Sequence, residues 1–135
     1  MAGQAMPDDT DAGPTLSGAV LVIEDDALIA LDLQDMMEAA GFGPVVLAHT
    51  PEDAKALAHN AYAIAIVDIK LDHGDSTAAV HALRARGTPF IVTTGYADPV
   101  NASTTFAGAP RLTKPFEEAE LHAALRAALK RNPVR

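Results

Sequence analysis

The chain has 135 residues, a formal net charge of −8 and no cysteine. This length predicts one domain with a sizeable core, and the missing cysteine excludes disulfides, thiolate metal sites and cysteine nucleophiles. The acidic balance argues against a nucleic-acid partner, which would require Lys and Arg contacts to phosphates, and the chain has no apolar run long enough to predict a membrane span.

Residues 1–17 differ in composition from the remainder of the chain. They are rich in Gly, Pro, Asp, Ala and Thr and show no periodicity, which predicts a disordered N-terminal tail. They also lack the basic and apolar regions of a signal peptide, so we expect a cytoplasmic protein. Residues 18–132 are expected to form the single folded domain.

Three short apolar runs and two weaker ones follow along the chain. Continuous apolar runs of this length are typical of strands that are buried on both faces. The predicted strands are Ala19–Ile23, Val45–Ala48, Ile64–Val67, Phe90–Thr94 and Arg111–Thr113.

Helical patterns separate these runs. The expected helices are Ala27–Ala40, a helix capped by Thr50 with Pro51 at its first position, a helix from Asp75 or Ser76 to Arg86, and a last helix over about Glu117–Lys130. Between them, Asp98–Phe106 contains poor helix formers and predicts a weak, mobile helix. Five strand–helix repeats predict an α/β fold, with a parallel sheet covered by helices on both faces.

Polar residues stand directly after the predicted strands, and in an open parallel sheet ligands bind at the carboxyl ends of the strands. These residues are expected to converge on one edge of the sheet. They are Glu24, Asp25 and Asp26 after the first strand, Asp68 after the third, Thr94 at the end of the fourth and Lys114 after the fifth.

This combination predicts a phosphoryl-transfer site. Carboxylates that lie close together repel unless a cation neutralises them, and Mg²⁺ is the natural cation for oxygen ligands. Lys114 adds an ammonium, Thr94 adds a hydroxyl, and Asp68 is the candidate nucleophile for an aspartyl-phosphate. Each residue alone could have an ordinary structural role. Asp68 could be a turn or capping residue, and Asp26 could be a helix cap. The prediction therefore depends on the whole set occurring at strand ends.

Four segments resemble the receiver domain of two-component response regulators. They are VLVIEDDALI at 20–29, IVDIKL at 66–71, TTGYAD at 93–98 and LTKPF at 112–116. The resemblance covers roughly residues 18–132. It implies a flavodoxin-like (βα)5 fold, doubly wound, with a five-stranded parallel sheet of strand order 2-1-3-4-5.

The resemblance also implies the metal site. Glu24 and Asp25 match the acidic pair of the family, with Asp25 as a direct Mg²⁺ ligand. Asp68 matches the phosphoacceptor, which also contacts the metal, and the backbone carbonyl of Lys70 completes the metal shell.

Two further matches concern the response to phosphorylation. Thr94 resembles the switch hydroxyl that contacts the phosphoryl group. Lys114 resembles the invariant lysine, and its bond to Pro115 is expected to be cis. Because Tyr96 and Lys70 occupy the two positions that tune dephosphorylation in receivers, we hypothesise that Lys70 slows or redirects the attack of water.

Two departures from the family pattern bear on the output. Arg111 replaces the aromatic residue that usually stands three positions before the lysine, so aromatic rotation on the fifth strand is not available. The segment PFIVTTGYAD resembles a subfamily with a Phe-Ala-Thr-Gly-Tyr motif, which occurs in stand-alone receivers and bacterial stress regulators, although Thr93 replaces its alanine.

The resemblance implies a single-domain response regulator rather than an enzyme. Its expected partners are a sensor histidine kinase or a histidine phosphotransfer protein, and a downstream protein. The downstream protein is expected to bind the surface of the fourth expected helix (Asp98–Phe106), the fifth strand (Arg111–Thr113) and the last helix (about Glu117–Lys130). A monomer or weak homodimer is expected. The five histidines show no metal-ligand spacing and are expected to be solvated, although His73, after Asp68, could affect access to the site. Two alternatives remain open, a detached receiver of a hybrid histidine kinase and a Mg²⁺-dependent phosphohydrolase that forms an aspartyl-phosphate.

Overall fold

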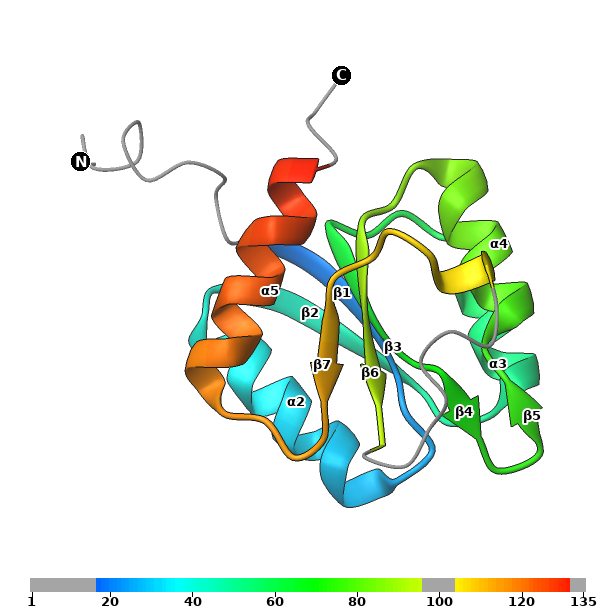
Figure 1. Ribbon diagram of the computed structural model, residues 1–135, viewed down its shortest axis with the longest axis horizontal. Coiled ribbons are helices and arrows are strands. Elements are labelled where there is room, and N and C mark those ends of the chain that lie inside the picture. The colour runs from blue at the N-terminus through cyan, green and yellow to red at the C-terminus, as the bar shows by residue number, and fades with distance from the viewer. Residues whose placement is uncertain (1–16, 96–103, 132–135) are drawn as a thin grey trace.

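A five-stranded parallel sheet lies between two layers of helices in the computed structural model, which describes residues 17–95 and 104–131 (Figure 1). The strand order is β2-β1-β3-β6-β7. The strands are β1 (Gly18–Ile23), β2 (Phe42–Ala48), β3 (Ile64–Asp68), β6 (Phe90–Thr94) and β7 (Arg111–Thr113). The helices are α2 (Ala27–Ala39), α3 (Pro51–Leu57), α4 (Thr77–Arg86) and α5 (Glu118–Arg131). The predicted α/β fold and the strand order 2-1-3-4-5 are confirmed.

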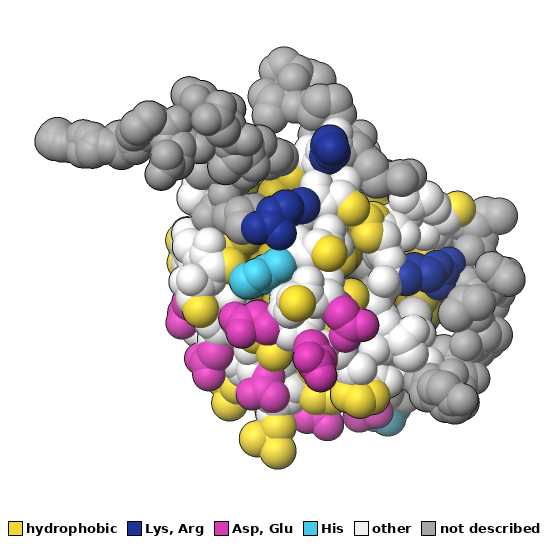
Figure 2. All heavy atoms as spheres, turned by 60° about the vertical axis from the view of Figure 1, so that its left-hand side comes forward, with side chains coloured by type: hydrophobic (Ala, Val, Ile, Leu, Met, Phe, Trp, Pro, Cys, Tyr) yellow, Lys and Arg dark blue, Asp and Glu magenta, His cyan; other side chains and the backbone are white. Residues whose placement is uncertain are grey.

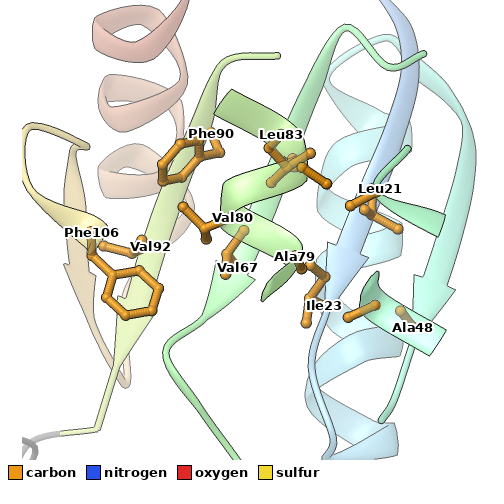
Figure 3. Close-up of a cluster of buried hydrophobic side chains, with 14 of the residues drawn as sticks. Leu21, Ile23, Ala48, Val67, Ala79, Val80, Leu83, Phe90, Val92 and Phe106 are labelled. Atoms are coloured by element: carbon orange, nitrogen blue, oxygen red, sulfur yellow. The ribbon is translucent and has the colours of Figure 1, made fainter. Parts of the chain in front are cut away.

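The core is divided into two clusters by the sheet, because successive side chains of a strand point to opposite faces. In β1, Leu21 and Ile23 pack on the side of α3 and α4, where α4 contributes Val80 and Leu83 (Figure 3). Val20 and its alternate neighbours pack on the other side, against α2 and α5. Burial on both faces explains why the central strands read as continuous apolar runs.

The helix that follows β1 keeps part of its apolar surface exposed. Leu28 of α2 is 77% exposed and Leu31 is 51% exposed. Asp32, Asp35 and Glu38 belong to the same helix. Figure 2 shows the side of the molecule that carries α2 and α5, where acidic and hydrophobic side chains gather in the lower half of the view.

The termini of the helices agree with the capping signals in the sequence. Asp26 caps α2 by accepting hydrogen bonds from the amides of Leu28 and Ile29. Thr50 caps α3 through the amide of Asp53. Gly87 ends α4 in the left-handed conformation, with a φ of 77°, which a residue without a Cβ adopts at little cost.

A small hairpin after β3 was not predicted. It consists of β4 (Lys70–Leu71) and β5 (Gly74–Asp75), which pair antiparallel around a two-residue turn. At its end Ser76 occupies the N-cap position of α4 without a side-chain capping bond, whereas the Asp75 carboxylate accepts from the amide of Thr77. The hairpin projects from the carboxyl edge of the sheet (Figure 1).

Some sequence predictions fall on residues that the structure does not describe. The predicted helix Asp98–Phe106 and Tyr96 lie largely outside them, and the described remainder of that helix is a short 3-10 turn, η2 (Thr104–Phe106). The predicted cis bond between Lys114 and Pro115 is confirmed, and a second cis bond joins Gly43 and Pro44. Among the described helices, none has the length and apolar character needed to cross a membrane.

Candidate functional site

The predicted site residues gather at the carboxyl edge of the sheet. Asp68 is the last residue of β3 and Thr94 the last of β6, while Glu24 follows β1 and Lys114 follows β7. An open pocket of about 650 Å³ lies at this edge. Its lining includes Glu24, Asp25, Asp26, Asp68, Lys70, Asp72 and Lys114.

Three carboxylates of this pocket form a compact group. One oxygen each from Glu24, Asp25 and Asp68 lie within 4.8 Å of one another. Glu24 and Asp68 are buried, and Asp25 is partly exposed. An all-oxygen donor set of this kind, open to water on one side, fits a magnesium ion, which takes one or two carboxylates and keeps several water molecules.

Lys114 joins the two buried acids. Its Nζ donates to Oδ2 of Asp68 at 2.9 Å and to Oε1 of Glu24 at 3.2 Å. Burial alone would lower the pKa of the ammonium, but the hydrogen bond and charge of Asp68, followed by those of Glu24, raise it above its usual value. Lys114 therefore stays charged at neutral pH.

The two buried acids have raised pKa values. Burial, and then the charge of Asp68, raise the pKa of Glu24 from 4.5 to about 7, despite the hydrogen bond from the Asp26 amide and the charge of Lys114. Burial also raises the pKa of Asp68, and Lys114 opposes this shift. One ammonium does not neutralise three neighbouring carboxylates, so the site favours an additional cation.

Backbone contacts hold Glu24 in place. The amide of Asp26 donates to Oε2 of Glu24 at 3.1 Å, and the Nδ1 atom of His49 lies 2.9 Å from the backbone oxygen of Glu24. The sequence did not indicate this contact, because His49 follows a weakly predicted strand and no motif links it to Glu24. His122 also departs from the solvated state expected of the histidines, since its Nε2 atom is buried and has no hydrogen-bond partner among the described residues.

Thr94 lies in the site but does not hydrogen-bond to Asp68. Its hydroxyl is buried and donates to the backbone oxygen of Gly95 at 3.0 Å. Its own backbone oxygen accepts from the amide of Lys114 at 2.8 Å, so the end of β6 is joined to the residue that follows β7. Its neighbour Thr93 pairs in register with Asp68, and the buried Thr93 hydroxyl has no hydrogen-bond partner in the part of the chain that the structure describes.

The unpredicted hairpin borders the pocket through Lys70 and Asp72. The amide of Ser76 donates to the backbone oxygen of Ile69 at 3.3 Å, which makes Ile69 and Ser76 a hydrogen-bonded pair. Paired residues of an antiparallel ladder alternate between bonded and non-bonded, so the backbone groups of Lys70, which faces Asp75, point away from the hairpin.

One predicted residue lies away from the site. Arg111 begins β7 and is exposed, so the length of that strand separates it from Lys114. Tyr96 is outside the described residues. His73 is exposed in the turn of the hairpin.

The family model for the response regulator receiver domain matches residues 20–126. The chain belongs to this family. A receiver domain is a phosphoacceptor module of two-component signalling, and the acidic pocket of Glu24, Asp25 and Asp68 agrees with that role.

Relatives of this receiver domain occur in longer proteins. The chain is 30% identical over 126 residues to the transcriptional regulatory protein PdtaR of Mycobacterium tuberculosis, covering 90% of the chain and 62% of PdtaR. It is 28% identical over 120 residues to the transcriptional regulatory protein FixJ of Bradyrhizobium diazoefficiens, covering 86% of the chain and 58% of FixJ. The chain therefore spans about three fifths of these curated relatives.

Solved structures of similar length share the fold. The solution structure of SdrG from Sphingomonas melonis is 33% identical, with a TM-score of 0.73 and coverage of 85% of this chain and 98% of SdrG. A CheY-like receiver domain from Methanospirillum hungatei is 26% identical with a TM-score of 0.72, covering 84% of this chain and 94% of that one.

Proposed function

We propose that this receiver domain acts as a single-domain response regulator that accepts a phosphoryl group on Asp68 in a Mg²⁺-dependent reaction. The observation that carries the proposal is the position of the Asp68 carboxylate, which ends the central strand, contacts Lys114 at 2.9 Å and lies among the acids Glu24 and Asp25. Receiver domains interact with histidine kinases, and we propose a sensor histidine kinase or a histidine phosphotransfer protein as the donor.

The transfer forms one bond and breaks one. An oxygen of the Asp68 carboxylate attacks the phosphorus of a phosphohistidine, and the bond between phosphorus and the imidazole nitrogen breaks, with its electron pair staying on the imidazole. Lys114 donates to Asp68 and also lies near the charge that develops on the phosphoryl oxygens. The chain thus acts mainly by positioning the acceptor and balancing charge.

We assign the metal site to Glu24, Asp25, Asp68 and the backbone carbonyl of Lys70, with Asp25 as a direct ligand. The oxygen donors described above fit Mg²⁺. When bound, the ion neutralises negative charge on the acids and on the phosphoryl oxygens.

Thr94 and Lys114 are the proposed elements of the response. The phosphoryl oxygens would attract the Thr94 hydroxyl away from its bond with Gly95. Because the Thr94 carbonyl accepts from the amide of Lys114, a shift of Thr94 acts on the start of the loop that leads to α5. The proposed output surface consists of the predicted helix Asp98–Phe106, which lies largely outside the described residues, strand β7 with Arg111, and α5. We propose that a downstream protein binds there.

The single-domain role and the Phe-Ala-Thr-Gly-Tyr subfamily belong to the proposal as well. They are supported by the segment 89–96 and by the similarity to SdrG over 98% of its chain. We further propose a cytoplasmic location, a monomeric or weakly dimeric state, and Lys70 and Tyr96 as the residues that set the lifetime of the phosphoryl group.

The test is an intact-mass measurement after incubation with Mg²⁺ and acetyl phosphate or a phosphorylated kinase. We expect one added phosphoryl group in the wild-type chain and none in Asp68→Ala. Steady hydrolysis of small phosphate esters would favour the phosphohydrolase instead, and the absence of any adduct would contradict the proposal.

A further inference from the structure

Asp72 lies at the tip of the β4–β5 hairpin and lines the same pocket as the acids of the proposed metal site. Asp25 lines this pocket too, and the neighbouring Asp25 carboxylate is the main cause that raises the pKa of Asp72. A solvent-exposed acid in a turn is usually a surface residue without a specific role.

The hairpin that carries Asp72 is anchored at several points. The Ser76 hydroxyl, which is buried, donates to the backbone oxygen of Asp68. Leu71 is 5% exposed and belongs to the core cluster under α4. Gly74 has a φ of 152° and approaches Pro51 so closely that a Cβ would lie 3.3 Å from its ring. The position of Asp72 beside Asp25 is therefore determined by packing.

Charge balance around Asp72 calls for a cation. Five carboxylates and two ammonium groups line the pocket, which leaves an excess of three negative charges when all are ionised. Lys114 is shared by Glu24 and Asp68, and the described part of the chain shows no ion pair to Asp72. Two carboxylates that approach one another at neutral pH require either a shared proton or a cation.

The hydration of Mg²⁺ indicates how Asp72 would interact with the ion. Mg²⁺ gives up its water reluctantly and usually keeps several water ligands. Those water molecules are strong hydrogen-bond donors, and an ionised carboxylate only accepts. Groups that hold the ligands of a metal in this indirect way often change its affinity 10- to 100-fold.

We propose that Asp72 is a positioning residue of the magnesium site. Its carboxylate accepts hydrogen bonds from water molecules on the ion that Asp25 holds, and it thereby raises the affinity for Mg²⁺. This inference rests on the proposed function of the same pocket, but it concerns binding of the ion and not transfer of the phosphoryl group.

The test is isothermal titration calorimetry with MgCl₂ and no phosphoryl donor, on the wild-type chain, Asp72→Asn and Asp35→Asn. Asp35 is an exposed acid of α2 outside the pocket, so its variant removes the same charge elsewhere. We expect roughly tenfold weaker binding in Asp72→Asn. Asp35→Asn should stay close to wild type, and Asp72→Glu, which keeps the carboxylate, should recover much of the loss.

Three results would overturn the inference: unchanged affinity in Asp72→Asn, equal weakening in Asp72→Asn and Asp35→Asn, or no Mg²⁺ binding by the wild-type chain. The second would reduce the effect to overall charge. If the wild-type chain binds Mg²⁺ but accepts no phosphoryl group, the proposed function fails, while the comparison of the variants still decides the role of Asp72.

Discussion

Glu24 makes the stability of the metal-free protein depend on pH in an unusual direction. It is 1% exposed, and burial together with the charge of Asp68 raises its pKa from 4.5 to about 7. Between pH 4.5 and pH 7, Glu24 keeps its proton in the folded chain but has released it in the unfolded chain. Stability from this proton is therefore fully present below pH 4.5 and is lost as the pH rises through 7.

The size of this effect follows from the shift. Each pKa unit corresponds to about 1.36 kcal/mol, so a rise from 4.5 to about 7 gives a loss of about 3 kcal/mol across this window. The raised pKa of Asp68 acts in the same direction. Most small domains are stable by only about 5–15 kcal/mol, so the loss should be easy to detect.

Urea unfolding at a series of pH values from 5 to 8 in the presence of a chelator measures this loss. We expect the free energy of unfolding to fall with pH in the wild-type chain. Glu24→Gln, which cannot ionise, should remove most of the slope, and saturating Mg²⁺ should counteract the loss at neutral pH because it favours the ionised acids. A flat wild-type profile without metal, or an equal slope in Glu24→Gln, would refute the reasoning.

Three substitutions test other parts of the site. Ser76→Ala leaves the buried carbonyl of Asp68 without its hydroxyl donor and should cost about 1–3 kcal/mol in urea unfolding, whereas an unchanged midpoint would show that the bond contributes nothing. Thr93→Val replaces a buried hydroxyl that has no partner within residues 17–95 and 104–131, so its thermal midpoint should stay equal or rise, and a clear drop would reveal a partner. Lys70→Ala should shorten the phosphoryl half-life, measured by loss of radiolabelled phosphate from the protein, and an identical half-life would exclude Lys70 from control of water attack.

The sheet and most of the site were predictable because burial leaves a strong signal in the sequence. Central strands that are covered on both faces need continuous apolar runs, and the residue at which the run stops marks the functional edge. Asp68 and Glu24 are visible for this reason. The caps Asp26 and Thr50 were equally clear, because a helix start requires a side chain that accepts hydrogen bonds.

The parts that were missed depend on tertiary contacts. The β4–β5 hairpin has strands of two residues each, and a strand this short shows no alternation in sequence. Asp72 therefore looked like an ordinary loop acid until the hairpin placed it beside Asp25. The start of β2 at Phe42 was also missed, because Gly43 and Pro44 are turn residues in most contexts.

The central claim is that Asp68 is the phosphorylated residue, and its tryptic peptide allows a direct test. Cleavage after Lys55 and Lys70 gives the peptide 56–70, in which Asp68 is the sole acidic side chain. After treatment with acetyl phosphate and Mg²⁺, reduction with borohydride converts an aspartyl-phosphate to homoserine, which mass spectrometry can locate. We predict homoserine at position 68 of this peptide. Homoserine in a different peptide, or an unmodified 56–70 in a sample whose intact mass shows the adduct, would contradict the account.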